Sequence, residues 1–300
     1  MNFLITGAWS QAKEFTDWFN KKGHNVVFMQ HEKDELPCDY LWVEGIIGNG
    51  IFLSHNIDKF KNLKYIQLTS VGYDRVPMSY VKLHNITINN AKGVYSIPMA
   101  EYAITGVMYL YKQMSSFEEN RKNKCWKKNR VLSELFDKTV CIVGCGNVGT
   151  ECAKRFSAFG CRIVGVDLFP QENDFYDRIV PISKLNEELS NSDILVLTVP
   201  LTKETSHLMN QYRLRLLKRE AIVVNISRGG VIDTSALVRI LPHIGGAVLD
   251  VFENEPLEID NKLWEMDRVV ITPHNSFVGE GNNSRLNNVI IKNLVDNHLA

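Results

Sequence analysis

The sequence predicts an α/β protein built from two doubly wound parallel-sheet domains. Short runs rich in Val and Ile alternate with helical stretches along almost the whole chain, a pattern typical of parallel α/β sheets. The chain has 300 residues, more than a single compact core usually holds. One long amphipathic segment in the first half separates two series of strand-like runs. These observations together indicate two domains joined by a helix.

The first series is a small doubly wound unit. Helical stretches such as Gln11–Lys22 lie between its strand-like runs. The predicted strands are Phe3–Thr6, Asn25–Met29, Gly45–Ile47, Tyr65–Thr69 and Thr87–Asn89.

The separating segment, Ile97–Arg121, is predicted as one helix that carries the chain into the second domain. Pro98 near its start suits a first helical turn. Its apolar residues follow helical spacing and form one face: Ala100, Ala103, Ile104, Val107, Met108 and Leu110.

The second series predicts a larger sheet of six strands, as in dinucleotide-binding domains. These strands are Thr139–Val143, Arg162–Asp167, Asp193–Thr198, Ala221–Ile226, Ala247–Val251 and Val269–Thr272. A last helix, Asn283–Leu299, is expected to pack back on the first domain. We therefore expect one domain of residues 1–95 with 279–300, and another of residues 96–278.

Composition and charge exclude several classes of protein. The formal net charge is zero, so nothing draws the whole chain toward nucleic acid or an anionic membrane. One local exception, Arg121–Arg130, holds six basic residues in ten. We interpret it as a solvated loop with one anchoring Trp126 rather than a nucleic-acid patch. A position near an anionic substrate is a weaker alternative.

The chain shows no membrane, export or metal signal. It begins MNFLITGAWS, without a basic stretch followed by a long apolar one, and no window approaches the roughly 18 apolar residues of a membrane span. A cytoplasmic location is the expectation. The cysteines form no CxxC pair, so neither structural zinc nor a disulfide framework is expected: Cys38, Cys125, Cys141, Cys145, Cys152 and Cys161.

The run VGCGNVG (143–149) fits the G-x-G-x-x-G pattern of dinucleotide-binding turns. The pattern alone is weak, but here an apolar strand precedes it and a helix with an apolar face follows. Gly144 would permit the tight turn, Gly146 would let the backbone approach a diphosphate, and Gly149 would let helix and strand pack closely. The N–H groups at the helix start favour the diphosphate.

The acidic partner of this turn is also present. Asp167 ends the next predicted strand, eighteen residues after Gly149. A carboxylate there accepts hydrogen bonds from ribose hydroxyls and repels a 2′-phosphate. The residues that follow, Leu168 to Pro170, offer no Arg or Lys to receive such a phosphate. The unit therefore predicts a Rossmann domain that binds NAD rather than NADP.

Three polar residues follow three later strands. VVNI leads to Arg228, AVLDVF leads to Glu255, and VVIT leads to His274. Ligands of open parallel sheets bind outside the carboxyl ends of the strands, so these side chains are expected to converge beside the nicotinamide. Each alone is more often a loop residue or helix cap; we base the functional interpretation on all three together with the glycine-rich unit.

The chemistry of this set suits the reduction of a 2-oxo acid. Arg228 can grip the carboxylate and carbonyl oxygens through its planar fork. His274 can give the proton as general acid, and Glu255 beside it would favour the imidazolium and orient the ring. The other histidines, for example His31, His55, His84 and His207, have no comparable setting and are interpreted as surface or structural.

At this point the chain resembles the D-isomer-specific 2-hydroxyacid dehydrogenase family over essentially its full length. The matching segments are VGCGNVG with Asp167, PLTKETSHLMN (200–210), VVNISRGGVIDTSAL (223–237), GAVLDVFENEPL (246–257) and VVITPHNS (269–276). The resemblance implies a flavodoxin-like substrate domain and a Rossmann NAD domain with a cleft between them. It also implies Arg228, Glu255 and His274 as the catalytic set, a small 2-oxo or D-2-hydroxy acid as substrate, and a homodimer.

The resemblance implies further site residues. In the second domain they are Asp250 at the nicotinamide carboxamide, Asn147 and Val148 at the pyrophosphate, Val199, Pro200 and Thr205 near the adenosine, and Ile226 and Ser227 near the nicotinamide. In the first domain, SVGYD (70–74) resembles the substrate loop, with the N–H groups of Val71 and Gly72 on the substrate carboxylate. Ser96, at the entry to the crossing helix, would lie near the cofactor phosphates.

Two positions depart from the family pattern. Phosphoglycerate-using relatives carry a basic residue after the third strand, where this chain has Ile47-Gly48-Asn49-Gly50. A phosphorylated substrate is therefore less expected, although the basic 121–130 stretch could compensate. After His274 the family often has small residues, whereas Phe277 here would narrow the pocket or shape the hinge.

Two competing functions are weighed against the dehydrogenase. One is a non-enzymatic NAD-sensing or scaffold protein on the same fold, against which the three intact residues argue without excluding it. The other is a one-carbon enzyme such as a formate dehydrogenase; those enzymes lack the Glu–His pair, so Glu255 speaks against it.

Overall fold

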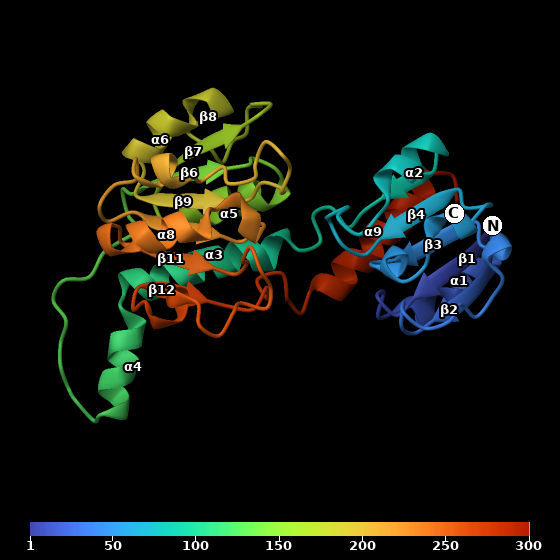
Figure 1. Cartoon of the computed structure of the whole chain (residues 1–300), viewed down its shortest axis with the longest axis horizontal. Coiled ribbons are helices and arrows are strands. Elements are labelled where there is room, and N and C mark those ends of the chain that lie inside the picture. Colours follow the sequence, from blue (N-terminus) through green and yellow to red (C-terminus); the bar gives the residue numbers. More distant parts are fainter. Residues whose placement is uncertain (300) are drawn as a thin grey trace. The chain divides into compact units, whose positions relative to one another are not determined.

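The structure is a computed structural model that describes residues 1–299. The chain divides into two compact units, one of Met1–Tyr95 with Gly279–Ala300 and one of Ser96–Val278 (Figure 1). Each unit contains its own parallel sheet. Two doubly wound parallel α/β units, as the sequence predicts, are thus confirmed.

Unit 1 contains a five-stranded parallel sheet with the order β2-β1-β3-β4-β5. This is the flavodoxin-type order, in which the second strand lies outside the first. The strands are β1 Asn2–Thr6, β2 Asn25–Met29, β3 Gly45–Gly48, β4 Tyr65–Leu68 and β5 Thr87–Asn89. The loops after β3 and β4 start side by side, because Gly48 pairs with Leu68 and the Thr69 N–H donates to the Gly48 carbonyl at 2.9 Å.

Both faces of this sheet are covered. Leu4, Ile46 and Ile66 pack on one face with the residues around α2, Met78–Leu83. Phe3, Ile5 and Ile47 pack on the other face with the C-terminal helix α9, Asn282–Asp296. The alternation of Phe3 and Leu4 between two cores is the period-2 pattern of a strand. Helix α9 begins almost two hundred residues after the last strand of this sheet, yet it packs within the same unit, as the Trp9–Asn287 hydrogen bond of 2.6 Å shows.

Unit 2 contains a seven-stranded parallel sheet with the order β12-β11-β10-β9-β6-β7-β8. This is the Rossmann order 3-2-1-4-5-6 with one more strand at the edge. The strands are β6 Thr139–Val143, β7 Arg162–Asp167, β8 Arg178–Pro181, β9 Ile194–Leu197, β10 Ile222–Asn225, β11 Gly246–Leu249 and β12 Val269–Ile271. The short edge strand β8 has no fully buried residue and was not predicted from the sequence.

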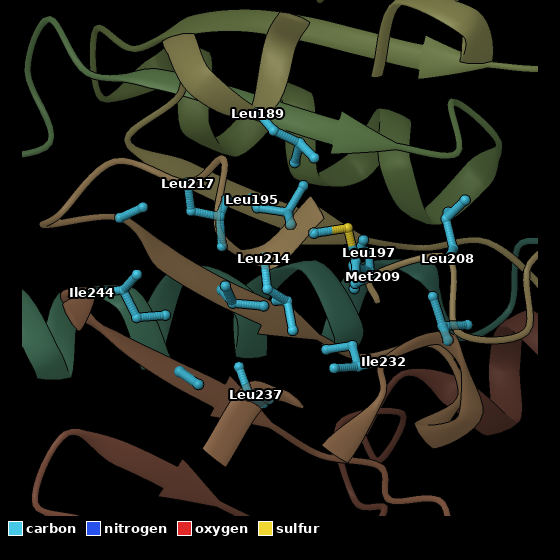
Figure 2. Packing of buried hydrophobic residues seen from close by; sticks show 14 of the residues in the cluster. Leu189, Leu195, Leu197, Leu208, Met209, Leu214, Leu217, Ile232, Leu237 and Ile244 are labelled. Carbon is cyan, nitrogen blue, oxygen red and sulfur yellow. The ribbon is translucent and has the colours of Figure 1, made fainter. Parts of the chain in front are cut away.

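The sheet of unit 2 separates two hydrophobic cores. Figure 2 shows one core, in which Leu195 and Leu197 of β9 lie among leucines of the helices on that face. Ile194 and Val196 point into the other core, against α3 and α5. The helices of this unit are α3 Ser96–Tyr111, α4 Met114–Lys122, α5 Asn147–Ala158, α6 Leu185–Asn191, α7 Gln211–Leu214 and α8 Thr234–Ile240.

Two predicted helices are interrupted. The expected helix Ile97–Arg121 ends at Tyr111, and α4 begins after Gln113, whose φ is 49°. The reason is packing: α3 buries an apolar face, whereas α4 buries no residue and projects from the unit together with the basic stretch (Figure 1). In unit 1, only Thr16–Lys21 of the expected helix Gln11–Lys22 is α-helical, as α1, after a short 3-10 helix Ala12–Phe15.

No helix within residues 1–299 is both long enough and apolar enough to span a bilayer.

Candidate functional site

The glycine-rich turn joins β6 to α5 in unit 2. Gly144 has a φ of +96°, a conformation that favours glycine, and its N–H donates to the Val166 carbonyl at 2.8 Å. A side chain on Gly149 would place Cβ 2.1 Å from the Gly144 carbonyl oxygen, so only glycine lets the helix approach the turn. A Cβ on Gly146 would meet nothing within 4 Å. Gly146 therefore faces open space at the start of α5, where a diphosphate fits.

Asp167 ends β7 beside this turn. Its carboxylate accepts hydrogen bonds from the Cys145 N–H at 2.7 Å and the Phe169 N–H at 3.0 Å. A cavity of about 250 Å³ opens there, lined by Cys145, Gly146, Asp167, Phe169, Gln171, Glu172, Asn173 and Ile179. An open glycine, a helix N-terminus and a carboxylate at one cavity are the features that a dinucleotide needs. The residues present fit NAD.

Six residues that line this cavity were not predicted as site residues: Cys145, Phe169, Gln171, Glu172, Asn173 and Ile179. Phe169, Gln171, Glu172 and Asn173 follow the acidic strand end closely, and this position is the one signal in the sequence that could have indicated them. Gln171 and Asn173 stand in a loop without regular spacing, so only the fold brings them to the cavity.

Burial controls the ionisation of Cys145, the cysteine in the glycine-rich turn. It raises the pKa of the Cys145 thiol to about 12, and the nearby Asp167 carboxylate acts in the same direction. Burial also raises the pKa of Cys141 and Cys152 to about 12. These thiols are therefore protonated and poor nucleophiles near neutral pH. Within residues 1–299 no cluster of His, Cys, Asp or Glu is arranged to hold a metal ion.

The remaining predicted cofactor residues lie on loops and helix starts of unit 2. Asn147 and Val148 form the first turn of α5, and Ser96 is the buried first residue of α3. Val199 lies against Gly144. Thr205 closes its own loop, since its hydroxyl donates to the Pro200 carbonyl at 2.6 Å. Ile226 and Ser227 are buried after β10, where the Ser227 hydroxyl donates to Asn225. Their contacts with the cofactor stay predictions.

Glu255 and His274, nineteen residues apart, form a hydrogen-bonded pair. His274 Nδ1 lies 2.8 Å from Glu255 Oε2, and the other carboxylate oxygen accepts from the Phe252 N–H at 3.0 Å. A carboxylate oxygen only accepts, so Nδ1 carries the proton and Nε2 is left to give or take one. Both side chains stay partly exposed, at 41% for His274 and 37% for Glu255. The pair can therefore reach a ligand.

Arg228 lies at the neighbouring strand end, after β10. Its guanidinium Nη1 donates to the Ser227 carbonyl at 2.7 Å. The next residue, Gly229, packs so closely that a Cβ would lie 1.8 Å from the backbone of Phe252. This contact holds the loop of Arg228 against the loop that leads to Glu255. Arg228, Glu255 and His274 thus follow three neighbouring strands, β10, β11 and β12, and the approach of the Arg228 side chain to the other two stays a prediction.

Asp250 is fully buried directly after β11. One of its carboxylate oxygens accepts from the Thr272 hydroxyl at 2.6 Å and the Asn275 N–H at 2.7 Å, and the other accepts from the Ser276 N–H at 2.9 Å. In this structure Asp250 therefore organises the turn that carries His274. Its expected contact with the nicotinamide carboxamide stays a prediction.

A second His–Glu pair was not anticipated from the sequence. His207 Nε2 lies 2.6 Å from Glu253 Oε1, and the other oxygen of Glu253 accepts from the Thr234 N–H at 2.8 Å. Burial opposes ionisation of Glu253, but the hydrogen bonds from Thr234 and His207 prevail and lower its pKa. The pair ties the 200–210 loop to the segment before Glu255.

The predicted substrate loop belongs to unit 1. Asn90 Nδ2 donates to the Val71 carbonyl at 2.7 Å, and the Ser70 hydroxyl donates to the Gly72 carbonyl at 3.3 Å. The neighbouring loop after β3 is the one that carries no basic residue at 47–50. There Glu32 accepts hydrogen bonds from the N–H groups of Asn49 and Gly50, both at 2.6 Å. The role of Val71 and Gly72 toward a substrate stays a prediction.

Comparison with known proteins identifies the class. Residues 104–276 match the family model described as D-isomer specific 2-hydroxyacid dehydrogenase, NAD binding domain. A glyoxylate reductase of Pyrococcus horikoshii is 34% identical, over 88% of this chain and 84% of that protein. A hydroxypyruvate reductase of Thermotoga maritima is 34% identical, over 87% of each. The D-lactate dehydrogenase of Aquifex aeolicus, solved with NAD and lactic acid, has a TM-score of 0.81 at 26% identity, covering 99% of this chain and 96% of that one.

The chain therefore belongs to the D-isomer specific 2-hydroxyacid dehydrogenase family. The resemblance noted in the sequence is confirmed, and so are the enzyme class and the cofactor: the protein is an NAD-dependent 2-hydroxyacid dehydrogenase.

Proposed function

We propose that this enzyme interconverts a small D-2-hydroxy acid and its 2-oxo acid, and that it acts as a reductase of short 2-oxo acids such as glyoxylate or hydroxypyruvate. The observation that carries the proposal is the hydrogen bond between Glu255 and His274 on strand ends next to Arg228. Relatives named glyoxylate reductase and hydroxypyruvate reductase support the choice of substrate.

Each residue has a separate task in this proposal. Bound NADH supplies the hydride. Arg228 binds the carboxylate of the substrate through its guanidinium, because two parallel N–H donors match two carboxylate oxygens. His274 gives a proton from Nε2 to the carbonyl oxygen as that oxygen gains charge. Glu255 accepts the hydrogen bond from Nδ1–H of the same ring, which orients the imidazole and leaves Nε2 to carry the transferred proton.

The test is NADH oxidation with glyoxylate, pyruvate, hydroxypyruvate and bulkier 2-oxo acids. We expect turnover with the short acids. His274→Ala should lower turnover at least about a hundredfold while NADH affinity stays nearly unchanged, since only a general acid is lost. Absence of turnover with every acid, together with tight NAD binding, would favour the alternative of a non-enzymatic NAD-sensing or scaffold protein. Near-normal turnover of the His274 variant would remove that residue from its role.

The family also suggests a homodimer, which we include in the proposal. Unit 2 exposes large apolar side chains in the segment after α4, with Trp126 96% and Val131 82% exposed. Sedimentation equilibrium of the purified protein tests this: a mass near twice 34.3 kDa supports a dimer, and a mass near 34.3 kDa contradicts it.

A further inference from the structure

A chain of hydrogen bonds runs from helix α3 to the turn that carries His274. The hydroxyl of Tyr102, on α3, is hydrogen-bonded to the hydroxyl of Thr272, directly after β12. The Thr272 hydroxyl donates to Asp250 at 2.6 Å. A threonine hydroxyl has one proton, which is used on Asp250, so Tyr102 must be the donor to Thr272. The hydrogen bonds therefore all run from donor to acceptor in one order, from Tyr102 to Thr272 and from Thr272 to Asp250.

Asp250, at the end of this series of hydrogen bonds, fixes the backbone at His274 and at the two residues that follow it. The His274 N–H donates to the Asp250 carbonyl at 2.8 Å, and the N–H groups of Asn275 and Ser276 donate to the Asp250 carboxylate. His274 itself has a φ of 51°, a left-handed conformation that a residue with a side chain rarely adopts. Such a conformation persists only where the surroundings impose it. Asp250 is the group that imposes it here.

Tyr102 is a suitable donor at the far end. Its phenol is partly buried, and this burial raises its pKa; the nearby Asp250 carboxylate acts in the same direction. The phenol therefore keeps its proton at neutral pH. Its proton keeps the Thr272 hydroxyl turned toward Asp250, because the lone pairs of Thr272 face Tyr102.

This series of hydrogen bonds lies close to both points at which the polypeptide passes from one unit to the other. The polypeptide passes between the units at Tyr95–Ser96 and at Val278–Gly279. Tyr102 lies six residues beyond the first crossing, and Ser276 lies two residues before the second. Inside unit 2, the hydrogen bonds thus tie the two connecting segments to each other.

We propose that Tyr102 is a positioning residue for the reaction, which sets the turn and ring of His274 through Thr272 and Asp250. This inference rests on the proposed role of His274 as general acid. Tyr102 itself touches no reacting atom.

The test compares variants along the chain in the NADH-dependent reduction of glyoxylate. Tyr102→Phe removes the terminal donor and should lower kcat about fivefold or more, and Thr272→Val should lower it about tenfold or more. The dissociation constant for NADH, read from its fluorescence, should stay within about twofold, because the glycine-rich turn is untouched. Thr272→Ser keeps the hydroxyl and should recover most of the turnover that valine loses. Tyr109→Phe, the same change at an exposed place on α3, is the matched control.

The decisive measurement places Tyr102→Phe in a His274→Ala background, assayed at high enzyme concentration. If Tyr102 acts through His274, the second change should lower the residual turnover by less than about twofold. A loss as large as in the wild-type background would overturn the inference, and so would full turnover of Tyr102→Phe. A His274→Ala enzyme with near-normal turnover would instead overturn the proposed function. Thermal melting of every variant, and the Thr272 pair, separate a positioning effect from a folding defect.

Discussion

At the scale of single residues, His274 follows β12 and depends on two groups that follow the neighbouring strand β11. Glu255 fixes the proton on one ring nitrogen, and Asp250 fixes the backbone around the residue. Neither could work from a flexible loop, since a shift of about 1 Å can lower a rate a hundredfold. The loop after β11 begins at a fully buried strand, and Asp250 at its start ties the turn after β12 to it, which explains how partly exposed side chains keep one geometry.

Asp167 should decide the choice between NAD and NADP. Asp167→Ala removes the carboxylate that would repel a 2′-phosphate, so the ratio of kcat/KM for NADH over NADPH should fall by about tenfold or more. NADH affinity should fall as well, because the Cys145 and Phe169 N–H groups lose their acceptor. Steady-state kinetics with both cofactors measure the ratio.

A matched control for this variant exists near the opposite end of β7. Asp177 accepts a hydrogen bond from the Ile163 N–H at 2.6 Å, away from the cavity. Asp177→Ala removes the same charge and should leave the cofactor ratio unchanged. If Asp167→Ala kept the full preference for NADH over NADPH, another residue would have to recognise the ribose.

At the scale of elements, two glycines in the turn between β6 and α5 should serve different purposes, Gly149 for close packing and Gly146 for cofactor binding. Gly149→Ala should destabilise unit 2 by about 1–3 kcal/mol or more, because its Cβ would meet the Gly144 carbonyl at 2.1 Å. Gly146→Ala should leave stability unchanged, since its φ of −74° suits alanine and nothing lies within 4 Å. The same methyl group should raise the NADH dissociation constant about tenfold or more, because it stands where the diphosphate approaches.

Urea unfolding and NADH fluorescence titration measure these two quantities on both glycine variants. Equal stability of the Gly149 and Gly146 variants would contradict the packing argument, and unchanged NADH binding by Gly146→Ala would contradict the position of the diphosphate.

At the scale of the whole molecule, the C-terminal helix completes the core of unit 1. Ile290 on α9 is fully buried against the sheet, whereas Val295 on the same helix is 50% exposed. Ile290→Ala should lower the free energy of unfolding of unit 1 by about 2–5 kcal/mol, and Val295→Ala by less than about 0.5 kcal/mol. Hydrogen–deuterium exchange should show faster exchange in β1 and no change in β6. An equal effect on both strands would mean that α9 does not belong to unit 1 in solution.

The acid stability of unit 2 should depend on Asp193, which joins the starts of β9 and β6. Burial opposes its ionisation, but the Thr139 N–H at 2.9 Å and Lys218 Nζ at 3.0 Å prevail and lower its pKa below the ordinary 3.8. A carboxyl whose pKa is lowered by folding stabilises the fold above its unfolded pKa and loses that effect as the pH falls through the folded pKa.

Wild type should therefore exceed Asp193→Asn in free energy of unfolding by a constant amount between pH 7 and about 5. The difference should shrink below about pH 4. Urea unfolding at pH 7, 5 and 3.5 measures it; a difference that grows toward acid would contradict the assignment.

Much of this molecule is determined locally and can be predicted from the sequence. Strand cores such as Thr139–Val143 are marked by apolar runs, and the glycine-rich turn by its spacing, because both depend on neighbours within one element. The edge strand β8 and the break after Tyr111 carry no such mark. A half-exposed strand forms only because β7 offers a free edge, and α3 ends where no core remains to cover.

The candidate site divides in the same way. The sequence by itself determined which residues follow the strands, among them Arg228, Glu255 and His274, since a parallel sheet brings all carboxyl ends to one edge. Only the tertiary structure decided that Glu255 meets His274 at 2.8 Å, that Asp250 holds the His274 turn, and that Tyr102 reaches Thr272 from another element. The physical reason is distance along the chain. Hydrogen bonds between residues far apart in sequence depend on how sheets and helices pack, and no local pattern encodes that packing.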